Sequence, residues 1–177
     1  MSESTFFMNR MSKAERFQFI KESQMFGAMN IPDLKSTLLG VFEKLDDKQQ
    51  VSIIKEYHYP EFADKTIELY AKSKSGEEAD WLGVSIIVPM VEHFSAKQIR
   101  EILNTVKKNI FVQCTQGTPQ ILATVFDSLN PDIIQKTKPD WLDVIDKLSK
   151  KHYPTDEYSY SDLWVKVSQR QQAYQPI

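Results

Sequence analysis

The sequence predicts an all-α fold, and three observations support this prediction. The chain of 177 residues contains only five glycines, well below the roughly 7% that is usual in proteins. Apolar residues recur every three or four positions through most of the chain, which is the period of one helix face. Four similar eight-residue segments have the form of a turn followed by a helix start. They begin at Met8, Phe42, Val91 and Phe126.

Each of these segments has an apolar residue first, an apolar residue fourth, and Ser, Asp or Asn fifth. The first three also have Glu or Gln eighth, which completes a capping box. In a capping box the short polar side chain accepts from a first-turn amide, and the Glu or Gln three residues later accepts from the amide of the cap. The fourth segment departs from the pattern, because Ile133 stands at its eighth position. We therefore interpret the four segments as turns between antiparallel helices.

Four helices are predicted in the N-terminal part of the chain, at about 12–26, 32–45, 46–57 and 61–72. Gly27 ends the first, and Pro32 stands in the first turn of the second, where its missing N–H costs little. Pro60 stops the third helix, since a residue before proline avoids the α region. The polar segment 72–78 has no apolar residue and is predicted to be a loop.

Six further helices are predicted, at about 80–91, 96–110, 118–129, 131–138, 140–150 and 160–169. Pro89 lies inside the first of these and predicts a kink, because its ring removes a backbone hydrogen bond. Pro139 is expected to separate the fourth from the fifth. Trp81 and Trp141 each follow an aspartate at an expected helix start, so we expect both indole rings to pack inward. A tryptophan left exposed would instead be a natural interface anchor.

The length and composition fit a single all-helical domain at 1–177 with flexible tails at 1–7 and 170–177. The longest apolar stretch, 82–91, is far shorter than the roughly 20 residues that span a bilayer. The first residues lack a basic start followed by an apolar run. The single cysteine, Cys114, excludes an internal disulfide. We expect a soluble, cytoplasmic protein with no membrane partner.

The four turns are offset by 34, 49 and 35 residues, and offsets of this size are typical of two-helix repeats. With its capped turns and Pro89, the chain resembles HEAT-like helical-repeat proteins, or α-solenoids. The resemblance implies antiparallel helix hairpins stacked as a short right-handed array. An irregular helical bundle, with turns that are similar by chance, is the alternative.

The basic face of the predicted helix at 95–108 is the first candidate binding surface. Its apolar residues share one side, and its cations share the other, with Glu101 as the opposing acid. The cations are Lys97, Arg100, Lys107 and Lys108. Such a face suits an acidic protein surface or phosphate groups. An ordinary solvated helix face, with cations near its C-terminus, explains the same residues.

Tyr158 and Tyr160 form the second candidate surface, in a tyrosine-rich segment before the last helix. Tyrosine in a loop suits recognition, because its large ring loses little entropy on binding. Packing of this segment onto the last helix is the alternative.

The sequence predicts no catalytic residue, metal site or cofactor. It has no His-x-x-x-His or Cys-x-x-Cys spacing, no Gly-rich phosphate loop and no Gly-x-Ser-x-Gly motif. Cys114 and His93 could in principle serve as a nucleophile and its base, but their separation in sequence says nothing about their distance in space. His58, His93 and His152 each stand where a helix is expected to end, and a helix C-terminus favours such residues.

Three functions remain open at this stage. The resemblance favours a non-enzymatic adaptor or regulatory module that presents a helical face to a partner protein. The alternative is a nucleic-acid or phosphate-binding repeat protein that uses the face at 95–108. The net charge of −2 argues against a dedicated nucleic-acid domain. The third is an enzyme whose residues are dispersed through the helices, and no reaction can be named for it.

Overall fold

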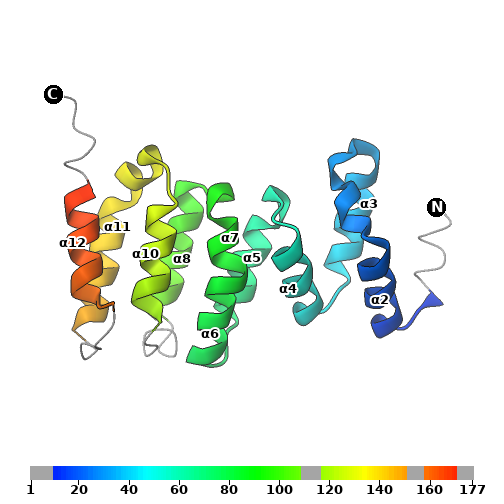
Figure 1. Cartoon of the computed structure of the whole chain (residues 1–177), viewed down its shortest axis with the longest axis horizontal. Helices are drawn as coiled ribbons and strands as arrows, with labels where there is room; N and C mark the ends of the chain where they lie inside the picture. Colours follow the sequence, from blue (N-terminus) through cyan, green and yellow to red (C-terminus); the bar gives the residue numbers. More distant parts are fainter. Residues whose placement is uncertain (1–9, 109–116, 151–157, 171–177) are drawn as a thin grey trace. The chain divides into compact units, whose positions relative to one another are not determined.

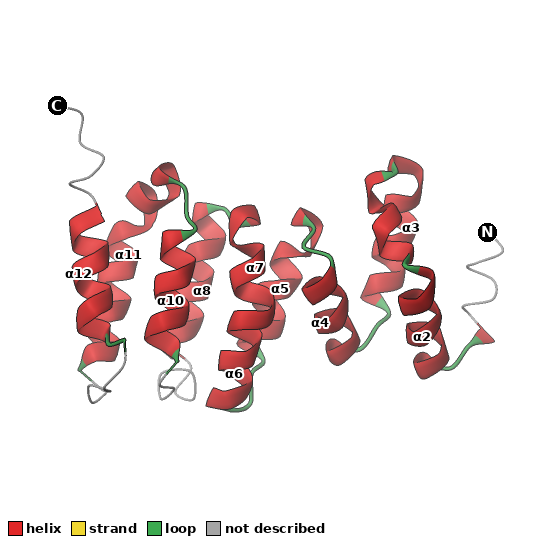
Figure 2. Cartoon of the chain, in the orientation of Figure 1, coloured by secondary structure: helices red, strands yellow, loops and turns green. Residues whose placement is uncertain are grey.

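The computed structural model describes residues 10–108, 117–150 and 158–170, and within these ranges all regular structure is helical (Figure 2). The predicted all-α class is confirmed. The predicted tails at 1–7 and 170–177 lie outside the described residues, except that Arg170 is the last residue of a helix. The chain divides into two compact units, Met1–Tyr57 and His58–Ile177, which are described in turn.

The described part of the first unit from Lys13 onward contains helices α2, α3 and α4 and one 3₁₀ helix. Their bounds are α2 Lys13–Ser23, η1 Met25–Asn30, α3 Pro32–Glu43 and α4 Asp47–Glu56. Helix α2 ends earlier than predicted, because Gln24 adopts a left-handed conformation with φ of 52° and a 3₁₀ turn follows. Phe26 is fully buried and packs edge-on against Phe42, with ring centroids 6.3 Å apart. Buried Gln50 donates through Nε2 to the Phe42 carbonyl at the end of α3, at 3.0 Å.

The second unit holds the remaining helices, which pack in two rows (Figure 1). Contacts run from α5 to α8 to α11 in one row, and from η3 and α7 to α10 to α12 in the other. The α-helices are α5 Ala63–Ala71, α6 Gly76–Leu82, α7 Val88–Met90, α8 Ala96–Lys108, α10 Thr118–Asp127, α11 Pro131–Ser149 and α12 Tyr160–Arg170. The shorter elements are η2 Pro60–Phe62, the π-helical turn η3 Gly83–Ile87 and η4 Val91–His93.

All four predicted helix caps form, through the side chains of Ser12, Asp46, Ser95 and Asn130. Two of them are complete capping boxes. Asp46 accepts from the Gln49 amide at 2.9 Å while Gln49 accepts from the Asp46 amide at 3.0 Å. Ser95 and Gln98 make the same exchange at 3.2 and 2.8 Å. The turn pattern therefore identified real helix starts.

The glutamine of each box also binds a helix start earlier in the chain. Gln49 Nε2 donates to the Lys13 carbonyl at 3.2 Å, in the first turn of α2. Gln98 Nε2 donates to Asp64 Oδ1 at 2.8 Å, in the first turn of α5. The two residues of each pair are 36 and 34 positions apart. Each unit thus contains a capping-box glutamine that joins two helix starts, through a backbone carbonyl in the first unit and through a carboxylate in the second.

The helix that contains Pro89 begins earlier than predicted, because Ser75 caps it by accepting from the Glu78 amide at 3.1 Å. Asp80 is therefore not in its first turn. A π-helical turn precedes Pro89, in which the Val88 amide donates to the Gly83 carbonyl five residues back. Because proline lacks an N–H, the series of helical backbone hydrogen bonds is interrupted at Pro89, and the wider π-helical turn accommodates this interruption.

The prediction that Pro139 separates two helices is wrong, since α11 runs without interruption through it. The buried residues on both sides of Pro139 form one continuous apolar face. They are Ile134, Thr137, Trp141, Val144, Ile145 and Leu148. Burial of such a face outweighs the roughly 3 kcal/mol that an interior proline costs. Asp140 is consequently a mid-helix residue.

The tryptophan prediction is confirmed for Trp141 and wrong for Trp81. Trp141 is fully buried and packs edge-on against Phe126, at 5.3 Å between ring centroids. Trp81 is 52% exposed. With Ser75 as the cap and Gly76 as the first helical residue, the buried positions around Trp81 are Ala79, Leu82 and Gly83, so Trp81 lies on the opposite side.

Gly83 allows the π-helical turn to approach α10 closely. A Cβ at this position would lie 3.1 Å from Ile121 Cγ2 and 3.2 Å from Cδ1. We predict that Gly83→Val lowers the free energy of unfolding by about 1–3 kcal/mol, because two further methyl groups enter a packed contact. Urea unfolding followed by far-UV circular dichroism measures the change.

Gly40 is the matched control, since a Cβ there meets nothing within 4 Å. Gly40→Ala, in helix α3, is expected to raise stability by up to about 1 kcal/mol through helix propensity. Equal effects of the two substitutions would contradict the close approach at Gly83.

Candidate functional site

The predicted basic face lies on α8, but two of its four cations are directed toward α11. Arg100 Nε lies 3.2 Å from Asp140 Oδ2, and Arg100 Nη2 donates to the Lys136 carbonyl at 2.8 Å. Lys107 Nζ lies 3.0 Å from Asp143 Oδ2. These contacts join α8 to α11 in the row that both helices share.

Lys97 and Lys108 are exposed, and no ion pair of either is seen in the described parts of the chain. Aspartates of α11 therefore offset the charge of Arg100 and Lys107, while Lys97 and Lys108 stand at opposite ends of α8. A phosphate-binding face needs several cations in one cluster. Because two of the four cations pair with α11 and the other two stand at opposite ends of the helix, α8 does not present such a cluster.

The two predicted tyrosines pack against the protein at the start of α12. Tyr160 is buried, and Tyr158 is half-buried, with its hydroxyl oxygen inaccessible to solvent. Burial raises the pKa of Tyr158 above its usual value, an effect that the Lys166 charge opposes and the Asp162 and Asp127 charges add to. The rest of the tyrosine-rich segment, 151–157, lies outside the described residues.

A capping box that the sequence pattern missed fixes the start of α12. Ser159 Oγ accepts from the Asp162 amide at 3.2 Å, and Asp162 Oδ2 accepts from both the Ser159 amide and its hydroxyl at 2.8 Å. These two hydrogen bonds, the backbone one first, lower the pKa of Asp162. Helix α12 is also joined to α10, since Lys166 Nζ lies 2.8 Å from Asp127 Oδ2.

Exposed apolar side chains, rather than the basic face, distinguish the surface of the second unit. On α6 and η3, Trp81 is 52% and Val84 62% exposed. On α12, Trp164 is 41% and Val165 49% exposed. Large apolar residues that lie next to each other on a surface are typical of interaction sites. Sequence reasoning missed Trp81 and Val84 because it placed the helix start at 80, four residues after the observed start at Gly76.

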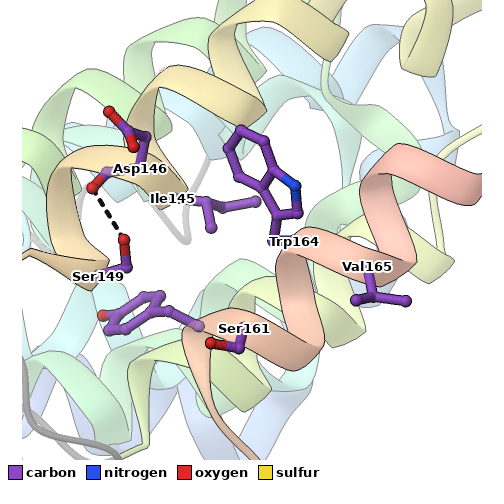
Figure 3. Close-up of a pocket in the computed structure, with 7 residues that line it drawn as sticks. Ile145, Asp146, Ser149, Ser161, Trp164 and Val165 are labelled. Atoms are coloured by element: carbon purple, nitrogen blue, oxygen red, sulfur yellow. Dashed lines mark hydrogen bonds between the residues drawn. The ribbon is translucent and has the colours of Figure 1, made fainter.

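An open hollow of about 290 Å³ lies between α11 and α12 (Figure 3). Ile145 lines its floor, and the Trp164 ring lies over it from α12. Asp146 and Ser149 come from the last turn of α11, where the Ser149 hydroxyl donates to the Asp146 carbonyl at 2.9 Å. Tyr160, Ser161 and Val165 complete the lining. Such a mixed, mostly uncharged hollow suits an apolar side chain from outside the unit.

The described residues contain no group of three or more His, Cys, Asp or Glu side chains that could hold a metal ion. Cys114 and His152 lie outside the described residues. His93 Nε2 lies 3.5 Å from Oε1 of its neighbour Glu92. Among the helices that the structure describes, none is both long and apolar enough to cross a membrane.

Comparison of the chain with protein-family models, with curated protein sequences and with solved structures finds no match.

The position of Arg100 predicts a role in stability. Arg100→Met keeps the apolar stem but removes the contacts to Asp140 and Lys136, so it should lower the free energy of unfolding. A double-mutant cycle with Asp140→Asn should give a coupling of about 0.2–1 kcal/mol, as is usual for a partly exposed pair. Lys97→Met is the control and should leave stability unchanged. Equal effects of Arg100→Met and Lys97→Met would contradict this role.

The capping box at Ser159 predicts a pH-dependent contribution of Asp162. The folded state lowers the pKa of Asp162. The contribution of its carboxylate to the free energy of unfolding is therefore complete above the unfolded-state pKa of about 3.9. That contribution is lost as the pH falls through the lower, folded-state pKa. Asp162→Ala should therefore lower the melting temperature at pH 7, and the difference from the unchanged protein should shrink below about pH 4. A difference that stays constant down to pH 2.5 would contradict the assignment.

Proposed function

We propose that this protein is a non-enzymatic interaction module of the adaptor or regulatory kind, which presents an exposed helical surface to a partner protein. The observation that carries the proposal is the exposure of Trp81 and Val84, one helical turn apart. We further propose that its hairpins form a short HEAT-like array and that it acts in the cytoplasm.

The two-row packing of the second unit supports the array. In helical-repeat proteins each helix pair contacts its neighbours in this manner. The glutamine links add to this support, because Gln49 in the first unit and Gln98 in the second each join a capping box to an earlier helix start. The same link at a similar separation is expected of a repeated structural unit.

The surroundings of Trp81 favour binding over chance exposure. The indole ring supplies a large apolar area, and tryptophan is enriched among the residues that dominate binding energy. Gly83, two residues after Trp81, packs closely on Ile121 of α10. The adjacent π-helical turn and Pro89 add a second constraint, and turns of this kind are frequent at functional sites. A side chain held by a rigid backbone loses little entropy when a partner binds.

No observation on the described residues favours the nucleic-acid alternative. Its two central cations, Arg100 and Lys107, form ion pairs with α11. The remaining two, Lys97 and Lys108, are eleven positions apart on α8. We therefore place the binding surface at Trp81 and Val84.

The proposal predicts that Trp81→Ser with Val84→Ser abolishes capture of a specific partner from native lysate. Loss of an aromatic anchor typically costs at least about 2 kcal/mol of binding free energy, which corresponds to a roughly 30-fold weaker affinity. Quantitative mass spectrometry of cross-linked pull-downs compares the variant with the unchanged protein. Circular dichroism melts show whether the variant is folded.

Trp164→Ser is the matched control, since it removes another exposed tryptophan and should retain the partner. If the unchanged protein captures no specific partner, or if the Trp81 and Val84 variant captures it equally well, the proposal is wrong.

A further inference from the structure

We infer that the surface at Trp81 and Val84 binds a basic segment of its partner protein, in which Lys or Arg side chains lie about one helical turn from an apolar side chain. We call this surface the acidic–apolar face and define it by Glu77, Glu78, Trp81 and Val84. The inference rests on the proposed function and deepens it, because it names the chemistry of the partner that this same surface recognises.

The four residues share one side of α6 and the π-helical turn that continues it. Glu77 and Glu78 precede Trp81 by four and three positions, and Val84 follows it by three. Residues at these spacings are neighbours on the surface of a helix. All four side chains are exposed. The two carboxylates therefore border the apolar pair at its N-terminal end.

The fold does not offset the charges of these two carboxylates with a cation. No ion pair of Glu77 or Glu78 is seen in the described part of the chain. Glu78 Oε2 accepts from the Lys74 backbone amide at 3.0 Å, and an amide carries no net charge. Carboxylates in a first turn are also favoured by the helix dipole, so their presence does not by itself identify a partner. The distribution of cations along the chain provides the further argument.

The two segments that form this part of the row contain no cation. The chain has 22 Lys and Arg residues, but none lies at 75–96, which contains α6 to η4, and none lies at 109–135, which contains α10. The turn η3 and helix α7 both contact α10 in the same row (Figure 1). The acidic–apolar face and the neighbouring helix of its row therefore carry acidic side chains without basic ones.

The cations of the next elements are paired with other groups. On α5, which contacts η3, and just after it, the Nζ atoms of Lys65 and Lys72 lie 3.2 and 3.4 Å from the Glu68 carboxylate. On α12, which contacts α10, Lys166 Nζ lies 2.8 Å from Asp127 Oδ2. These cations therefore do not compensate the carboxylates of α6.

A basic, apolar segment matches the acidic–apolar face in both respects. Lys74, in the turn before α6, is the nearest cation in sequence, and one lysine beside two exposed carboxylates leaves a net negative charge. A partner cation that lies one turn, roughly 5 Å, from an apolar side chain can reach Glu77 or Glu78 while that side chain covers Trp81. The apolar contact supplies most of the affinity, and the charges select the partner by repelling acidic segments.

Selection from a random peptide display library on the immobilised, unchanged protein tests the chemistry of the partner. We expect the enriched peptides to combine a large apolar residue with Lys or Arg residues about one turn away. Their binding should be lost in the Trp81→Ser with Val84→Ser variant. The inference is overturned if the peptides that depend on Trp81 and Val84 are neutral or acidic.

Fluorescence anisotropy with one enriched peptide measures the contribution of the carboxylates. Glu77→Gln with Glu78→Gln keeps an acceptor for the Lys74 amide and should weaken binding about three- to tenfold at low salt. High salt should reduce this difference, because it screens exposed charges. Circular dichroism melts show whether the variant is folded.

Glu101→Gln with Asp132→Asn is the matched control, since it removes the same net charge from α8 and α11 and should bind the peptide normally. If no enriched peptide depends on Trp81 and Val84, the proposed function and this inference are both wrong. If such peptides exist but bind the Glu77 and Glu78 variant as tightly as the unchanged protein, the inference alone is overturned. It is also overturned if the control variant weakens binding to the same extent.

Discussion

The hydrogen bonds of Gln98 at the joint between α5 and α8 constrain much of the second unit. Its Oε1 atom accepts from the Ser95 amide and its Nε2 atom donates to Asp64, so one side chain fixes a helix start and its neighbour together. Because each residue turns a helix by about 100°, a shift of one position would move the whole apolar face. The position of the cap therefore determines that Ile99 and Leu103 face the core while Arg100 and Lys107 reach α11. Gln49 makes equivalent bonds in the first unit.

The sequence was informative where structure is decided by nearby residues. A cap and its partner lie three positions apart, so the turns at Ser12, Asp46, Ser95 and Asn130 were predictable. Errors arose where a local signal was weaker than tertiary packing. Pro139 is a strong helix breaker by itself, yet the apolar face of α11 extends across it. Ser159 and Asp162 form a full box that was missed, because aspartate is not the usual residue at that position.

The candidate site was harder to predict, for a physical reason. Whether a cation binds a ligand or stabilises the fold depends on which side chains lie opposite it. For Arg100 that residue is Asp140, 40 positions later, and no periodicity within α8 reports it. The tyrosines show the same limit, since the sequence leaves open whether Tyr158 and Tyr160 form a recognition loop or pack onto the last helix, and the structure packs them at the start of α12. The sequence names any exposed tryptophan as a possible anchor, but the exposure of Trp81 follows from the actual helix start at Gly76.

The exposed apolar residues of the second unit are concentrated at the beginning and at the end of one row of helices. In the row of α6 with α7, α10 and α12, the first and last helices carry exposed pairs, Trp81 with Val84 and Trp164 with Val165. The middle helix, α10, presents polar positions such as Gln120, Thr124 and Asp127 to solvent in their place. Within the second unit, α10 is packed against α7 and η3 on one side and against α12 on the other. The two exposed pairs therefore lie on the elements that begin and end this row. The π-helical turn beside the first pair and the hollow beside the second, whose described lining includes Asp146, make the two surfaces chemically different.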